Sequence, residues 1–165
     1  MPEILLHYIW QKHLWSGFVQ QTTDGQVIEV ISTGQYNTHA GPDFSNAHIR
    51  IGNQEWIGNV EIHVHSSDWN KHHHNIDPAY NNTILHVVCQ NDQEVYNSAG
   101  EKIIQCELKY SKIGKVDETI LKRIKNAMEN QAQLYDNTDI PHYYYLVDKF
   151  YPIENFTKKS NRALY

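Results

Sequence analysis

Two stretches of alternating polar and apolar residues, 45–51 and 56–65, flank a glycine–asparagine pair, and this arrangement constrains the fold of the 165-residue chain more than any other feature. Successive side chains of a β-strand point to opposite faces of the sheet, and Gly-Asn between two alternating runs is a hairpin signal. The second strand ends in VEIHVH and turns its apolar residues toward the core. Its other face therefore carries Glu61, His63 and His65 side by side.

The remaining periodicities predict an α+β (mixed α/β) domain whose central mixed sheet is flanked by helices. Besides this hairpin, the sequence predicts a helix over 3–15, strands over 26–33 and 83–90, a short helix within 66–82, and a helix over 116–135 capped by Asp117. Strands over 93–97 and 102–110 are expected to form a second hairpin around Ser98-Ala99-Gly100. The periodic spacing of apolar residues ends near residue 136. We therefore expect one domain over 1–136 and an aromatic C-terminal appendage over 137–165, which is interpreted as the possible start of a longer chain.

Composition excludes several classes of protein. Apolar runs are far shorter than the roughly 20 residues that a membrane-spanning helix needs. The N-terminus Met1-Pro2-Glu3 lacks the basic region of a signal peptide, and two cysteines make no disulfide framework. A cytoplasmic protein without a membrane partner is therefore expected.

The charge distribution limits any contact with nucleic acid to a local surface. The chain carries a net charge of −5, whereas a protein that binds nucleic acid over a broad surface is basic. Seven Lys or Arg and only three Asp or Glu fall within 102–125. Candidate contacts to nucleic acid are Arg50, Lys112 and Lys115; the alternative for the basic segment is a solvated helix face.

Two acidic residues are placed where they can share a divalent cation. Asp43 follows Gly41-Pro42 at the entrance of one strand, and Glu61 lies in the neighbouring strand. Two carboxylates and the backbone carbonyl of Ile62 would give an oxygen-rich site, which suits Mg²⁺ or Mn²⁺ better than Zn²⁺. Such an ion polarises a phosphoryl oxygen and supplies hydroxide near neutral pH.

This layout resembles the PD-(D/E)XK nuclease superfamily. Pro42, Asp43 and Glu61 match its motif, and the predicted order of elements matches its core of helix, three strands, helix and strand. The resemblance implies metal-dependent cleavage of phosphodiesters, with Asp43 and Glu61 as metal ligands. The chain departs from the motif at its third position, where His63 replaces lysine. A neutral imidazole can position water or bind metal, but it lacks the fixed charge of an ammonium group.

A longer stretch, residues 37–88, resembles a bacterial family known only as a conserved domain of unknown function. The resemblance is carried by the ordered blocks HAGPDF, GNVEIHVHSSDW and ILHVV. It implies no particular activity.

Histidines form the second candidate cluster. Eleven occur in the chain, and a His-x-His strand pair with a third histidine from a nearby loop is a reasonable metal triad. In the loop, His72–His74 are consecutive, so at most one of the three is expected to reach an ion. His74 is preferred with His65 as its partner, and His72 is the alternative. His86 lies in an apolar strand and is interpreted as a core histidine.

The sequence thus predicts a metal-dependent phosphodiesterase acting on nucleic acid. In it Asp43 and Glu61 would hold the ion, His63 would position or activate water, and His65 and His74 would assist. Two alternatives remain open at this stage. One is a non-catalytic nuclease-like module that binds nucleic acid or a protein; the other is a histidine-rich hydrolase that uses Zn²⁺ or Mn²⁺ on a small substrate.

Overall fold

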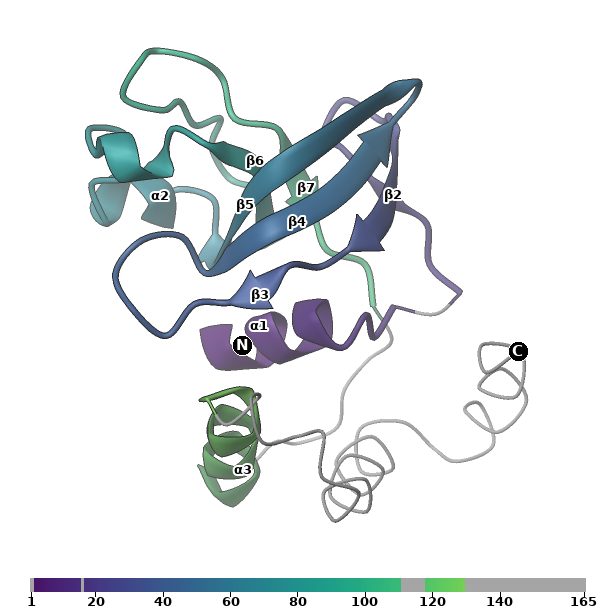
Figure 1. Cartoon of the computed structure of the whole chain (residues 1–165), viewed down its shortest axis with the longest axis vertical. Coiled ribbons are helices and arrows are strands. Elements are labelled where there is room, and N and C mark those ends of the chain that lie inside the picture. Colours follow the sequence, from purple (N-terminus) through teal and green to yellow (C-terminus); the bar gives the residue numbers. More distant parts are fainter. Residues whose placement is uncertain (1, 16, 111–117, 130–165) are drawn as a thin grey trace. The chain divides into compact units, whose positions relative to one another are not determined.

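The computed structural model describes residues 2–15, 17–110 and 118–129, which belong to two compact units, Met1–Tyr110 and Ser111–Tyr165 (Figure 1). The first unit contains every strand of the described chain. Its elements are α1 (Glu3–Gln11), β1 (Gln20–Gln21), β2 (Val27–Ser32), β3 (Gln35–Tyr36), β4 (Phe44–Ile51), β5 (Gln54–His65), α2 (Asp68–Lys71), the 3-10 helix η1 (Pro78–Tyr80), β6 (Thr83–Gln90) and β7 (Gln105–Glu107).

The strands form one mixed sheet in the order β1-β2-β4-β5-β6-β7, with β3 paired to β4. Pairing is antiparallel from β1 to β5 and parallel from β5 to β7. The sheet curls until its two edges approach, and the Thr23 amide donates a hydrogen bond of 3.0 Å to the Gln105 carbonyl. The predicted α+β class with a mixed sheet is confirmed, and the sheet is nearly closed rather than an open sheet between helical layers.

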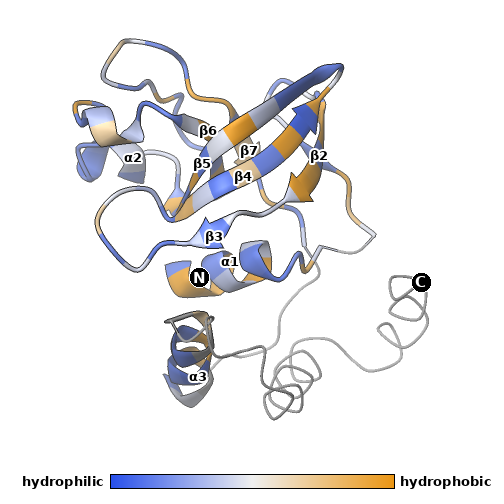
Figure 2. Cartoon of the chain, in the orientation of Figure 1, coloured by the Kyte–Doolittle hydropathy of each residue, from blue (hydrophilic) through white to orange (hydrophobic). Residues whose placement is uncertain are grey.

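The central hairpin follows the predicted alternation. Gly52 turns the chain with φ of 60°, a left-handed conformation that suits glycine. Figure 2 shows hydrophilic and hydrophobic residues alternating along β4. On the inward face of β5, Val60 and Ile62 are fully buried, and they lie beside Leu85 and Val87 of the parallel strand β6. These four residues anchor β5, whose opposite face carries the candidate site.

Two expectations about the elements are wrong. The first helix ends at Gln11 rather than residue 15, because His13 takes a left-handed φ of 56°. The hairpin expected from strands 93–97 and 102–110 is reduced to one bridge, between Tyr96 and Lys102. Cys106 and its neighbours pair parallel with β6 instead, which buries Cys106 against the sheet. The two-residue strands β1 and β3 are too short to show an alternation.

The second unit contributes α3 (Glu118–Glu129), inside the helix predicted over 116–135. The expected cap at Asp117, the boundary at 136/137 and the aromatic appendage lie outside the described residues. None of the described helices is long and apolar enough to cross a membrane.

Candidate metal centre

Asp43 and Glu61 are joined by hydrogen bonds between the entrance of β4 and the middle of β5. The Asp43 amide donates to Oε2 of Glu61 at 3.0 Å, and the Ile62 amide donates to Oδ2 of Asp43 at 2.8 Å. The structure therefore brings the two predicted carboxylates together. Glu61, however, is buried rather than open to solvent as a ligand of an exposed site would be.

Two histidines, His63 and His74, lie beside the other oxygen of Glu61, and His72 lies beside His63. Oε1 of Glu61 lies 3.0 Å from Nε2 of His74 and 3.5 Å from Nε2 of His63. Nε2 of His63 is in turn 3.1 Å from Nδ1 of His72. One ligand atom from each histidine lies within 4.8 Å of the other two. His63 and His74 are buried and His72 is exposed, so the cluster opens toward solvent on the side of His72.

The turn after α2 explains how two of the three consecutive histidines reach the site. The His73 amide bonds to the Asn70 carbonyl and the His74 amide to the Trp69 carbonyl, the pair of bonds that defines a Schellman C-cap. His73 takes the left-handed position of this motif, with φ of 62°. At most one of the three consecutive histidines was expected to reach an ion, but the reversal at His73 leaves both His72 and His74 beside His63.

His86 is both a core residue and a partner of the site. It is fully buried, and its Nε2 lies 2.8 Å from Nδ1 of His63, so one of these nitrogens carries a proton that the other accepts. Burial, with the neighbouring histidines, lowers the pKa of His63 to about 2 and that of His86 to about 3. Both rings are therefore neutral at physiological pH, the state in which imidazole binds metal.

The donor set fits a transition metal ion. Burial and the charge of Asp43 raise the pKa of Glu61 to about 9. A cation bound beside the carboxylate would favour its ionised form and lower this pKa. In a tetrahedral site with metal–nitrogen distances of about 2.0–2.1 Å, ligand atoms are about 3.3 Å apart. Three contacts have about this spacing: Glu61 to His74 at 3.0 Å, Glu61 to His63 at 3.5 Å and His63 to His72 at 3.1 Å. The ligand atoms of the three histidines lie within 4.8 Å of one another. The carboxylates alone led to the expectation of Mg²⁺ or Mn²⁺ rather than Zn²⁺, whereas imidazole nitrogens suit Zn²⁺ better than Mg²⁺.

Sequence reasoning missed two residues of α1, Glu3 and His7, that lie beside Asp43. Nε2 of His7 lies 3.3 Å from Oδ2 of Asp43 and 3.9 Å from Oε1 of Glu3. Burial lowers the pKa of His7, but the carboxylates of Asp43 and Glu3 outweigh it and raise that pKa overall. The available signal was the spacing of Glu3 and His7 by four residues, which places both on one face of a helix.

Other predicted site residues lie apart from the cluster. The His65 side chain is 44% exposed, and its nearest acidic partner is Asp68, with Nδ1 and Oδ2 3.8 Å apart. Arg50 donates hydrogen bonds to Glu29 at 2.9 Å and Glu55 at 2.7 Å on an exposed face of the sheet. Its charge is therefore engaged by two carboxylates. The remaining candidates for nucleic acid, Lys112 and Lys115, lie outside the described residues.

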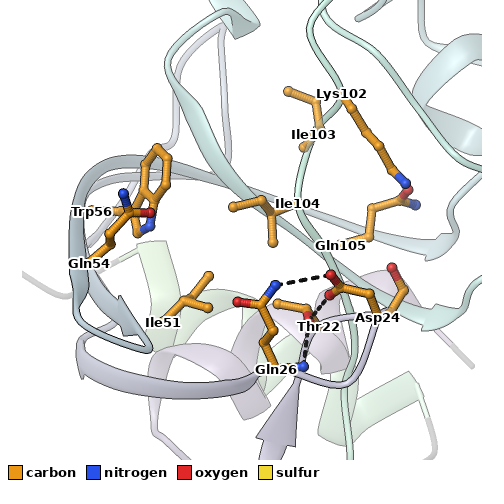
Figure 3. Close-up of a pocket in the computed structure, with 11 residues that line it drawn as sticks. Thr22, Asp24, Gln26, Ile51, Gln54, Trp56, Lys102, Ile103, Ile104 and Gln105 are labelled. Carbon is orange, nitrogen blue, oxygen red and sulfur yellow. Dashed lines mark hydrogen bonds between the residues drawn. The ribbon is translucent and has the colours of Figure 1, made fainter.

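A separate pocket of about 260 Å³ lies at the end of the central hairpin (Figure 3). Ile51, Trp56 and Ile104 form apolar walls, and the Gln26 side chain donates a hydrogen bond of 3.0 Å to the carboxylate of Asp24. None of the histidines or carboxylates of the metal centre lines this pocket, so the two features are distinct.

The comparison with known protein families identifies the chain. A family model described as "Protein of unknown function (DUF2851)" matches residues 3–154, and the chain belongs to this family. The match confirms the resemblance to a conserved domain of unknown function. No curated protein and no solved structure matches the chain.

Without a bound ion, the free energy of unfolding is expected to peak near pH 6.5. Below that pH the histidines become protonated in the unfolded chain, whereas buried His63 and His86 stay neutral in the folded chain. Acid therefore favours unfolding. Between pH 4.5 and about 9 the unfolded chain releases a proton that Glu61 retains, so base favours unfolding. The two histidines outweigh the glutamate below pH 6.5. Above it Glu61 and His7, whose pKa values are both raised, favour unfolding as the pH rises.

Each of these groups changes the free energy of unfolding by about 1.4 kcal/mol per pH unit within its window. Urea unfolding in the presence of a chelator, at several values between pH 5 and pH 8.5, measures the profile. A stability that is constant over this range, or that is highest at pH 8.5, would contradict the assignment of buried neutral imidazoles and a buried protonated carboxyl group.

Proposed function

We propose that the chain is a metal-dependent hydrolase of the phosphodiesterase type, with Zn²⁺ or Mn²⁺ held by Glu61, His63, His72 and His74. The observation that carries this proposal is the convergence of three imidazole nitrogens within 4.8 Å of one another, beside a buried carboxylate. Each recorded ion pair of Glu61 is with a histidine, not with a lysine or arginine. A divalent ion would supply the positive charge that this site lacks.

The choice of a phosphodiester as substrate is supported by the arrangement of the elements. α1 precedes three antiparallel strands β2, β4 and β5, and α2 with η1 then leads to β6, which is parallel to β5. This order of elements supports the nuclease resemblance as the basis of the proposal. Asp43 and Glu61 occupy the two acidic positions of that motif. Nucleic acid is therefore the proposed substrate class.

The burial of His63 changes the role proposed for it. Only 1% of its side chain is exposed, and its two ring nitrogens face His86 and His72. A residue that takes a proton from water needs a nitrogen directed at solvent or substrate. His63 is therefore proposed as a metal ligand rather than as the residue that activates water.

The other residues take roles that follow from their exposure. A bound ion would polarise a phosphoryl oxygen and lower the pKa of its water. His72 is exposed, so the scissile phosphate is proposed to approach from its side of the cluster. Asp43 holds Glu61 through its backbone amide and accepts from the Ile62 amide, which fixes the carboxylate between the histidines and the entrance of β4.

The test is cleavage of single- and double-stranded DNA and RNA with Mn²⁺, with Zn²⁺ and with a chelator. We expect cleavage only with metal, and a loss of at least about 100-fold in His63→Lys, because an ammonium group cannot replace a ligand. His65→Ala is the matched control: this histidine lies on the same strand, outside the cluster, and its loss should leave cleavage unchanged.

Three outcomes would overturn parts of the proposal. Cleavage that survives in chelator or in His63→Lys would contradict the metal centre as assigned. Hydrolysis of a small phosphodiester such as bis(4-nitrophenyl) phosphate, without cleavage of any nucleic acid, would favour the small-substrate hydrolase. Metal binding without hydrolysis of any of these substrates would favour a non-catalytic binding module.

A further inference from the structure

We infer that α1 completes a second cation site, formed by Glu3, His7 and Asp43, which shares the carboxylate of Glu61 with the histidine site. The inference rests on the proposed metal centre, because Glu61 is common to both positions. It assigns metal-binding roles to Glu3 and His7, and it makes the centre one for two ions rather than one.

The contacts around His7 define the position. Nε2 of His7 is 3.3 Å from Oδ2 of Asp43 and 3.9 Å from Oε1 of Glu3. Glu3 and His7 lie close together because residues four apart lie one above the other on a helix. The hydrogen bond from the Ile62 amide fixes the position of the Asp43 oxygen that faces His7. An imidazole and two carboxylates thus converge from two separate elements.

The His7 side chain is nine-tenths buried and lacks a hydrogen bond. Its exposed fraction is 9%, and within the described part of the chain neither Nδ1 nor Nε2 makes a hydrogen bond. Nδ1 therefore lacks a partner among the described residues, whereas Nε2 has the carboxylates of Asp43 and Glu3 as ion-pair partners. Two carboxylates around one imidazole nitrogen attract positive charge to that position, which a divalent cation can supply in place of a proton.

Glu61 divides its two oxygens between the sites. Oε1 lies among His63 and His74, whereas Oε2 accepts the hydrogen bond from the Asp43 amide. One carboxylate can therefore contact an ion on each side, as in hydrolytic centres whose two ions are about 3.5–4 Å apart.

The two positions differ in ligand chemistry and access. The site on α1 has one imidazole and several carboxylate oxygens, which favours Mn²⁺ over softer ions. The Glu3 side chain is 39% exposed, so this position opens to solvent at the first turn of α1. We therefore assign to it the weaker-binding and more readily exchanged ion of the pair.

The experiment counts Mn²⁺ ions in the full chain by calorimetric titration and by elemental analysis at equilibrium with a buffer of known free Mn²⁺. Two ions per chain are expected for the wild type, with an exchange-coupled Mn²⁺ pair in its electron paramagnetic resonance spectrum. Glu3→Gln should weaken the second ion at least about tenfold and remove the coupled signal, while the first ion stays bound. Because Glu3 is partly exposed, this substitution does not depend on repacking the core.

Two further variants separate the possible failures. Glu29→Gln changes an exposed glutamate on β2 and should still bind two ions. His7→Asn should reproduce the effect of Glu3→Gln. A wild type that binds one ion, with equal affinity in Glu3→Gln, would overturn the second site and leave the proposed function standing. A wild type that binds neither Mn²⁺ nor, in a parallel titration, Zn²⁺ would overturn both.

Discussion

Replacing His72 by alanine is expected to weaken the binding of Zn²⁺ or Mn²⁺ at least about 100-fold and to leave the metal-free fold unchanged. Loss of a residue that merely orients a ligand costs 10- to 100-fold in metal affinity, so loss of a ligand should cost no less. His72 is exposed, and its Nδ1 lies 3.1 Å from Nε2 of His63. Removing the ring therefore opens no cavity in the core.

Calorimetric titration with each ion measures the affinity, and circular dichroism of the metal-free protein checks the fold. His73→Asn is the matched control, since asparagine tolerates the left-handed backbone of this position and His73 lies outside the cluster. Equal losses of affinity in His72→Ala and His73→Asn, or no loss in either, would show that the loop does not provide a ligand.

Replacing Glu61 by glutamine is expected to stabilise the metal-free protein and to abolish its stabilisation by metal. The raised pKa of Glu61 means that the wild type loses stability as the pH rises from 4.5 toward about 9, because only the unfolded chain ionises freely. Glutamine does not titrate and keeps an oxygen for the Asp43 amide. At pH 8 the gain is on the order of 5 kcal/mol, or on the order of 10 °C in Tm.

The order of stability should reverse when metal is added. The wild type gains stability in proportion to the logarithm of the free ion concentration above its Kd, whereas the Glu61→Gln variant gains little. Thermal unfolding at pH 8, with chelator and with millimolar Mn²⁺, measures both effects. A metal-free variant that melts below the wild type, and that is stabilised equally by Mn²⁺, would contradict the role of Glu61 as a buried ligand.

The strand alternation predicted the central part of the site. The period of two in VEIHVH placed Glu61 and His63 on one face, and both side chains are found there, with the inward Val60 and Ile62 fully buried. The approach of Asp43 to Glu61 also followed from sequence, because a strand entrance and the middle of its hairpin partner meet at a fixed register. The alternation of residues along each strand was therefore enough to predict that Asp43, Glu61 and His63 lie near one another.

The remaining parts of the site depend on contacts that periodicity does not encode. His72 and His74 converge because His73 takes a left-handed conformation in a helix cap, which a run of three histidines does not reveal. Glu3 and His7 join Asp43 through the packing of α1, a contact between distant segments.

The parallel pairing of β6 with β7 was missed for a related physical reason. The turn residues Ser98-Ala99-Gly100 predicted a hairpin, yet tertiary packing against β6 draws Gln105–Glu107 away from that local partner. The turn itself forms, with backbone hydrogen bonds from Asn97 to Glu101 and from Ile103 to Val95. Beyond it, Gln105–Glu107 pairs with β6, which buries Cys106 against the larger sheet.

The most direct test of the metal centre is an anomalous difference map from crystals grown with Zn²⁺ or Mn²⁺, recorded at the absorption edge of that metal. The structure predicts a peak within bonding distance of His63, His72, His74 and Glu61, with His65 uninvolved. A peak bound elsewhere on the chain, or no peak at this cluster when the ion is present in excess, would contradict the account.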